Sequence, residues 1–197
     1  MEELILERFE ELQACIEDYR SKRMEQKKKL LKTDRTQLNR LFCETLDAAI
    51  NHQTEKQSLD EQERVRYLFL CQLASSRHTE SYKVLLGMSN SKLYLDDSKV
   101  TVFWYPEPIY QNVKEDMKEV RKLLKEKDEQ YEEEELLKLK QKLLEDDWNL
   151  LREQFPELVE EYFYRITESN LQIEEQFSAL CGDYMERLPV VWDKIVV

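Results

Sequence analysis

Glycine is extremely scarce in this chain: 197 residues contain only two, Gly87 and Gly182. Folds that bind nucleotides through a glycine-rich turn need glycine where the backbone approaches phosphate. Neither glycine belongs to a G-x-G-x-x-G motif or a P-loop, which excludes nucleotide binding through those motifs. All-β folds need many turns with special backbone angles. The composition therefore favours helices joined by few tight turns.

Apolar residues recur at helical spacing through the first half of the chain. Phe9, Leu12, Ile16 and Tyr19 share one face and predict a first helix that ends near residue 31. Three more helices are predicted, over about 34–52, 58–73 and 79–87. The run YLFLCQLA within the third is apolar on most faces, so we expect that helix to be the most buried. Gly87 is expected to close the fourth as a C-cap.

The pattern changes in the middle of the chain. The stretch SKLYLDDSKVTVFWY has strand-like residues on both sides of DDSK, which is typical of a turn. It predicts a β-hairpin over about 92–105, ended by Pro106 and Pro108 because proline cannot donate to a ladder. Alternate residues of its second strand are apolar on both faces. The hairpin is therefore either sandwiched between helices, which we favour, or exposed on one face to a partner.

Helical spacing returns after residue 111. The apolar seam lapses over 125–135, which predicts either a corner between two helices or one long rod, and the charges at both ends favour the corner. Pro156 is expected in the first turn of a last helix that runs to Leu188. The apolar tail after Pro189 is consistent with a docked strand, a truncation point or a contact surface.

Together these patterns predict a mostly α-helical fold. We expect a bundle-like domain of about six to seven amphipathic helices with one central β-hairpin. Its parts are an N-terminal lobe (1–88), a hairpin and proline-containing connector (89–110) and a C-terminal lobe (111–197). We expect them to form one cooperative domain.

Charge is unevenly distributed in this acidic chain, whose net charge is −12. A basic patch comprises seven residues: Lys22, Arg23, Lys27, Lys28, Lys29, Lys32 and Arg35. Nucleic-acid sites usually interleave aromatic residues with such cations, and here the aromatic residues only flank them. We therefore favour pairing with the acidic segment 126–135, within the fold or in a partner, over nucleic-acid contact.

Catalytic and metal-binding patterns are absent from the sequence. The four cysteines, Cys15, Cys43, Cys71 and Cys181, are far apart, and neither His52 nor His78 has a zinc-like spacing with them. We expect no catalytic residue, cofactor or metal. The cysteines, the acidic start of the chain and the lack of a long apolar run predict a reduced cytoplasmic protein that does not span a membrane.

Surface contact is the function that these observations favour. We expect a non-catalytic cytosolic protein-interaction module, such as an adaptor, a regulator or an inhibitor. Its acidic surface would suit a basic partner protein. The expected contact residues are Trp104, Tyr105, Tyr110, Glu132, Glu133, Glu134 and Glu135. A homodimer through 111–155 or 159–188 is compatible with this. The alternatives are a nucleic-acid-associated regulator that uses segment 20–40 and a small helical enzyme with a Cys/His site.

Overall fold

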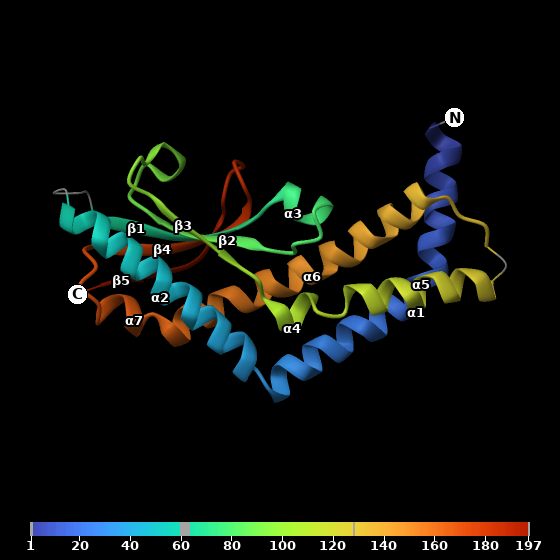
Figure 1. The fold of residues 1–197 in the computed structure, drawn as a ribbon, viewed down its shortest axis with the longest axis horizontal. Coiled ribbons are helices and arrows are strands. Elements are labelled where there is room, and N and C mark those ends of the chain that lie inside the picture. Colours follow the sequence, from blue (N-terminus) through green and yellow to red (C-terminus); the bar gives the residue numbers. More distant parts are fainter. Residues whose placement is uncertain (1, 60–63, 128, 197) are drawn as a thin grey trace. The chain divides into compact units, whose positions relative to one another are not determined.

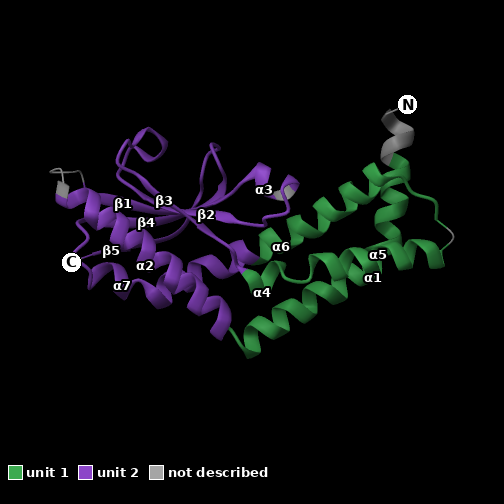
Figure 2. Ribbon diagram, viewed as in Figure 1, with its two compact units in different colours: residues 1–35, 107–150 green, residues 36–106, 151–197 purple. Residues whose placement is uncertain are grey.

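The computed structural model describes residues 2–59, 64–127 and 129–196; for residues 2–6, 59 and 77 it describes the backbone alone. The chain divides into two compact units, each built from two separate segments (Figure 2). Unit 1 comprises residues 1–35 and 107–150, and unit 2 comprises residues 36–106 and 151–197. The expectation that the lobes 1–88 and 111–197 unfold together as one cooperative domain stays a prediction, and unfolding measurements would test it.

Within the described residues, α1 (Glu2–Thr33), α4 (Glu107–Tyr110) and α5 (Val113–Glu126) belong to unit 1, and α6 (Glu133–Tyr162) contributes to both units. Unit 1 has a core of leucine, isoleucine, valine and methionine side chains from α1, α5 and the first part of α6. These are the seams that the sequence predicted for this unit. The corner between α5 and α6 is confirmed, since one helix ends at Glu126 and the next begins at Glu133.

Unit 2 is built on a mixed sheet of five strands in the order β3-β2-β1-β4-β5 (Figure 1). The strands are β1 (Val65–Gln72), β2 (Val84–Ser89), β3 (Val100–Trp104), β4 (Ile173–Asp183) and β5 (Val190–Ile195). The β1–β4 pair is parallel and the other pairs are antiparallel. The remaining elements are α2 (Thr36–Leu59), α3 (Ala74–His78), a 3₁₀ turn (Leu93–Leu95) and α7 (Tyr164–Thr167).

The predicted bundle with a single hairpin is therefore wrong. The run YLFLCQLA, predicted as the most buried helix, contains most of the central strand β1. A short run that is apolar on every face suits a strand covered on both sides as well as a buried helix, so periodicity cannot separate the two. The predicted helix over 79–87 is also wrong, because β2 begins at Val84.

The hairpin over 92–105 is half correct. Its second strand is β3, but β3 pairs with β2, and the residues of the predicted first strand form the 3₁₀ turn. The predicted last helix is wrong beyond α7: Pro156 lies inside α6, and residues 173–183 form β4. In β4, Phe177, Ala179 and Cys181 recur at every second residue, the spacing of one face of a strand. The helical spacing that was read through the same segment had hidden this pattern.

Gly87 does not cap a helix. It lies in β2 opposite Phe69 of β1. A Cβ atom at this position would overlap the Phe69 ring and lie 2.7 Å from the carbonyl oxygen of Val100. The glycine is therefore needed for the close packing of an aromatic ring on the sheet.

Candidate interaction surface

The two faces of the sheet in unit 2 are covered differently. One face, here called the covered face, packs against α2, the last part of α6 and α7, whereas loops lie over the opposite face (Figure 1). On the covered face the Phe42 ring lies 5.5 Å from Trp104 and 6.2 Å from Phe155, centroid to centroid. Phe163 of α6–α7 lies 5.4 Å from Phe177 of β4. Helical aromatic side chains thus seal this face.

Trp104 belongs to the covered face. Its side chain is 1% exposed, and Tyr110, in unit 1, is also buried. Tyr105 is half-buried. Of the expected aromatic contact residues, the structure thus brings Trp104 into the core of unit 2 and buries Tyr110. Phe103, on the other face of the same strand, is 62% exposed, so the stretch is covered by helices on one face and is not sandwiched between them.

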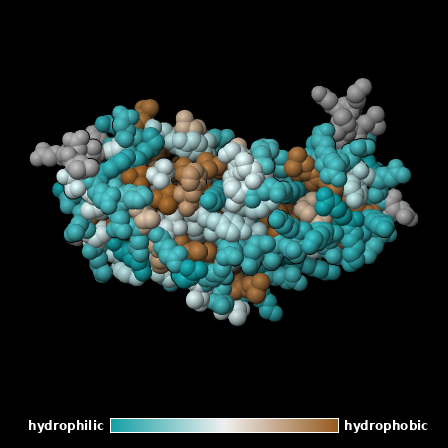
Figure 3. Space-filling view, viewed as in Figure 1, coloured by the Kyte–Doolittle hydropathy of each residue, from teal (hydrophilic) through white to brown (hydrophobic). Residues whose placement is uncertain are grey.

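The opposite face exposes a group of large apolar side chains. Cys71, Leu85 and Phe103 lie in one cross-strand row on this face. Six of the nine exposed large hydrophobic residues of the described chain lie here or on the loops over it. We call this group the open face: Leu95 (83% exposed), Phe103 (62%), Tyr184 (40%), Met185 (65%), Val190 (57%) and Ile195 (73%). Figure 3 shows apolar side chains reaching the surface over the strands of unit 2.

Beneath these residues the face is packed. Phe69, Cys71, Leu85, Leu180 and Leu188 form a buried cluster on this side of the sheet. Burial raises the pKa of the Cys71 thiol to about 12, so the thiol stays protonated and behaves as a small apolar group. The exposed residues therefore lie over a tightly packed apolar layer.

The loop that presents Leu95 is held by one buried carboxylate. Asp96 accepts hydrogen bonds from the backbone N–H groups of Asn90 (2.8 Å) and Ser98 (2.7 Å) and from the Ser98 hydroxyl (2.5 Å). The Lys99 amine donates to the carbonyl oxygens of Tyr94 and Asp96. These bonds hold the loop in one conformation.

A second loop is joined to the first through Tyr94. The Tyr94 hydroxyl accepts a hydrogen bond from the Met185 backbone N–H (3.1 Å), and its ring meets the Tyr184 ring edge to face at 5.8 Å. Leu93 and Met185 both have positive φ, at 51° and 67°. Bulky residues with left-handed backbone are rare and concentrate at functional sites. Both loops of the open face thus hold one such residue.

The basic patch is divided by burial. Arg23 donates to Asp116 (2.7 Å) and Asp147 (2.5 Å), and Lys27 donates to Asp147 (2.7 Å), all inside unit 1. Lys22, Lys28, Lys29 and Lys32 are exposed, and Arg35 is half-buried. Burial raises the pKa of the Asp147 carboxyl and lowers that of the Lys27 amine, since desolvation penalises both charges. The buried cations face Asp116 and Asp147, and neither is part of the segment 126–135.

The acids 132–135 serve the start of α6. The Glu135 carboxylate accepts a hydrogen bond from the Glu132 backbone N–H (2.8 Å), as in a capping box. Glu134 pairs with Lys138 one turn on (2.9 Å), which lowers the Glu134 pKa, and Glu133 lies 4.0 Å from Arg121. The acids 132–135, which were expected to contact a partner, thus take part in contacts within the chain, and three of these four residues remain exposed.

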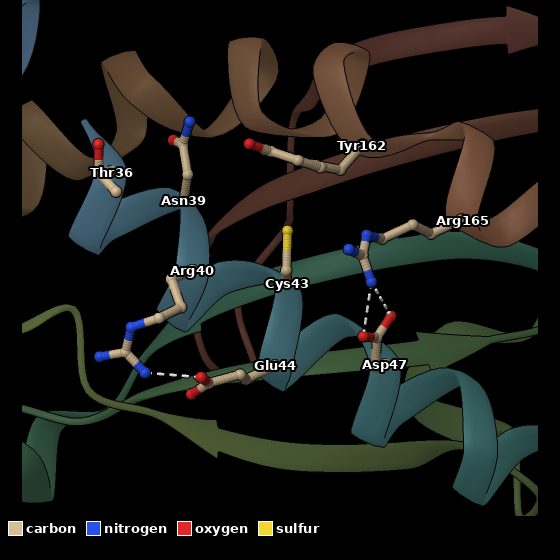
Figure 4. A pocket seen from close by; sticks show the side chains of 8 residues that line it. All are labelled: Thr36, Asn39, Arg40, Cys43, Glu44, Asp47, Tyr162 and Arg165. Atoms are coloured by element: carbon tan, nitrogen blue, oxygen red, sulfur yellow. Dashed lines mark hydrogen bonds and ion pairs between the residues drawn. The ribbon is translucent and has the colours of Figure 1, made fainter. Parts of the chain in front are cut away.

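A groove of about 520 Å³ lies on the helical side of unit 2, lined by residues of α2, α6 and α7 (Figure 4). Cys43 points into it, between Tyr162 and Arg165. Burial raises the pKa of the Cys43 thiol, and the nearby Arg165 guanidinium offsets this only in part. Arg165 is bonded to Asp47 (2.6 and 2.9 Å), and Arg40 to Glu44 (2.6 Å). The groove therefore holds a protonated thiol among paired charges.

No histidine lines this groove. Both histidines are exposed, and His78 ends α3. Nucleophilic catalysis by cysteine needs a thiolate beside a base, and this geometry does not supply one at Cys43. In the described parts of the chain, no three histidine, cysteine, aspartate or glutamate residues group as metal ligands.

Comparison with protein-family models, with curated proteins and with solved structures found no match. Among the described helices, none is both long and apolar enough to cross a lipid bilayer.

The open face was largely missed by the sequence analysis. Phe103 was seen to point away from Trp104, but the face it belongs to is assembled from strands that were assigned to helices. One signal was available: D-D-S in the predicted turn places Asp96 two residues before Ser98, the spacing of an Asx turn. Nothing local marked Tyr184 or Met185, because their loop exists only once β4 and β5 have paired.

Proposed function

We propose that this protein is a non-catalytic cytoplasmic interaction module that binds a partner protein through the open face. The observation that supports this best is the exposure of Leu95, Phe103 and Met185 on one face of a sheet whose other face is sealed by helices. Solvent-exposed apolar residues scattered singly need no explanation, but Leu95 and Met185 are presented by two loops that Tyr94 joins, and neighbouring exposed apolar residues mark an interaction site.

The geometry of the open face supports docking in a second way. Its loops are held in place by Asp96 and Tyr94, so binding freezes few additional torsions. Phe103 and Tyr184 supply large, stiff aromatic area, the kind that dominates binding energy in measured interfaces. The four cysteines are free, which suits a reducing compartment.

The partner's chemistry follows from charge and shape. A chain with a net charge of −12 attracts a basic protein at long range and speeds encounter. The open face then requires an apolar patch on that protein. The proposed partner is therefore a basic protein with exposed aliphatic or aromatic side chains.

We expect Phe103→Ser to weaken partner capture at least about tenfold, the loss typical of an aromatic anchor. The matched control is Leu30→Ser, because Leu30 is 63% exposed in unit 1, almost the same as Phe103. Both variants should keep the parent's unfolding midpoint. The measurement is quantitative affinity purification from native lysate with the parent and both variants.

The partner sought is a protein that the parent and the Leu30→Ser variant retain and the Phe103→Ser variant does not. Hydrogen exchange is then measured on the parent with and without this bound partner. Protection should appear over 89–104 and 183–195. Equal capture by both variants, or protection confined to other segments, would show that the open face is not the docking surface.

A further inference from the structure

The outer edge of β5 has free backbone hydrogen-bonding groups. In the part of the chain that the structure describes, β5 is the last strand of the sheet and pairs with β4 alone. The Val196 N–H donates to the Glu175 carbonyl (2.7 Å). In an antiparallel pair, alternate residues bond to the same neighbour, so Val196, Lys194 and Trp192 direct their backbone groups toward β4. Asp193 and Ile195 alternate with these, and their N–H and C=O groups therefore point away from β4.

This edge is accessible and continuous with the open face. Asp193 pairs in register with Ser178, and Ile195 pairs with Gln176. Both side chains lie on the side of the sheet that bears the open face, whereas Trp192 packs against Phe163 on the covered face (4.9 Å). Asp193, Lys194 and Ile195 are all exposed. A strand added here would extend the sheet and lie beside the open face.

Pairing of β5 with a second copy of itself is opposed by charge. Two copies related by a two-fold axis pair antiparallel, and outward-bonding residues must meet each other. One such register places Asp193 opposite Asp193, and the next places Lys194 opposite Lys194. Like charges directly opposite each other destabilise a strand pair. A third register places Ile195 opposite Ile195 and brings no like charges together, but within the described residues this is its only outward-bonding pair.

We infer that β5 accepts an extended segment of a partner protein by strand addition, with a lysine or arginine opposite Asp193. An acidic residue opposite Lys194, whose amine also pairs with Glu160 (3.6 Å), and an aliphatic one opposite Ile195 complete the match. The main-chain hydrogen bonds supply affinity and the alternating side chains supply the choice of partner. The inference rests on the proposed function only in that the partner is a protein.

The test uses blocked hexapeptides and fluorescence anisotropy. In the antiparallel register, the peptide Thr-Val-Glu-Lys-Val-Thr sets its lysine against Asp193, its glutamate against Lys194 and its first valine against Ile195. The control, Thr-Val-Lys-Glu-Val-Thr, has the same composition with the charges exchanged. We expect it to bind about tenfold more weakly, because two opposite-charge pairs become like-charge pairs. A third peptide, N-methylated at both its lysine and its first valine, cannot donate to Asp193 or Ile195 and should not bind.

The chain itself offers the reciprocal control. Asp193 is exposed, and Asp193→Lys should abolish the preference between the first two peptides without changing stability, because each peptide then makes one opposite-charge pair and one like-charge pair. Phe103→Ser should leave peptide binding unchanged, so loss of partner capture in that variant reports on the open face and not on β5. Equal binding of the two charge arrangements, binding of the N-methylated peptide, or binding of none of the three would overturn the inference.

Discussion

At the scale of the residue, the scarcity of glycine has a structural consequence. Among the described residues, four have clearly positive φ and none of them is glycine: Glu80, Tyr82, Leu93 and Met185. All four lie in loops of unit 2. Both glycines are used elsewhere, for close packing beneath Phe69 and Leu188. The sheet is thus built with ordinary residues in the left-handed turns where glycine is expected, and these turns are strained.

Met185→Gly tests that strain. A left-handed residue costs about 1–2 kcal/mol when it has a Cβ, and glycine loses about 0.4–1 kcal/mol through the entropy of the unfolded chain. Because Met185 is well exposed, we expect Met185→Gly to be neutral or to raise the free energy of unfolding by up to about 1 kcal/mol.

The adjacent Glu186→Gly is the matched control, since Glu186 is exposed and lacks a positive φ. It should lower the free energy of unfolding by about 0.5–1 kcal/mol. Urea denaturation of both variants makes the comparison. If Met185→Gly destabilises as much as Glu186→Gly, the turn is not strained.

At the scale of the element, three helices of unit 1 are joined by a buried ionic network. Arg23 and Lys27 of α1 meet Asp116 of α5 and Asp147 of α6, and Tyr19 also donates to Asp116 (2.8 Å). Arg23 and its two acids are separated by 93 and 124 residues in the chain. Such a network fixes which helix faces meet, because any other rotation would leave a charge buried without a partner.

Asp147→Ala removes the acid that Arg23 and Lys27 share. Both cations would stay buried with their main partner missing, and we expect a loss of about 3–5 kcal/mol in the free energy of unfolding. The control is Glu44→Ala on α2, which breaks an exposed Arg40–Glu44 pair and should change stability by under about 1 kcal/mol.

Urea titration followed by helical circular dichroism measures both variants. Similar small losses for the two would mean that the network does not hold the three helices together.

At the scale of the whole molecule, the fold removes part of the basic patch from the surface. Two of its seven cations are buried in ion pairs, and the neighbouring Arg20 is bonded to Asp146 through two hydrogen bonds. The exposed remainder belongs to a chain whose net charge is −12. A phosphate backbone would therefore meet net repulsion on approach.

We expect the protein to pass through a phosphocellulose column at low salt, about 50 mM, without retention. A matched comparison is the variant Lys28→Gln with Lys29→Gln, which lacks two exposed cations and should elute identically. Retention of the parent that falls steeply with salt, and is reduced in the variant, would revive the nucleic-acid alternative.

Several elements followed from the sequence. The amphipathic seams of α1 and α2 and the corner before α6 were predicted because local spacing and helix-end charges fix them. The strands β1, β2 and β4 were not, since each was assigned to a helix. A run such as YLFLCQLA is apolar on all sides and satisfies either geometry, so the neighbouring strands decide between them. The open face was hidden because its members come from β3, from β5 and from loops between strands, which only the assembled sheet brings to one side.

The sequence by itself determined the acidic charge, the dispersed cysteines, the scarcity of glycine and the helices with a clear apolar stripe. These depend on composition or on residues within a few turns of each other. Only the tertiary structure decided that the apolar runs form one sheet, that Trp104 lies in its covered face and that Phe103 lies on the open face. Those outcomes depend on pairing between distant segments, such as Val65 with Ile173, and a strand is stable only once its neighbours are present.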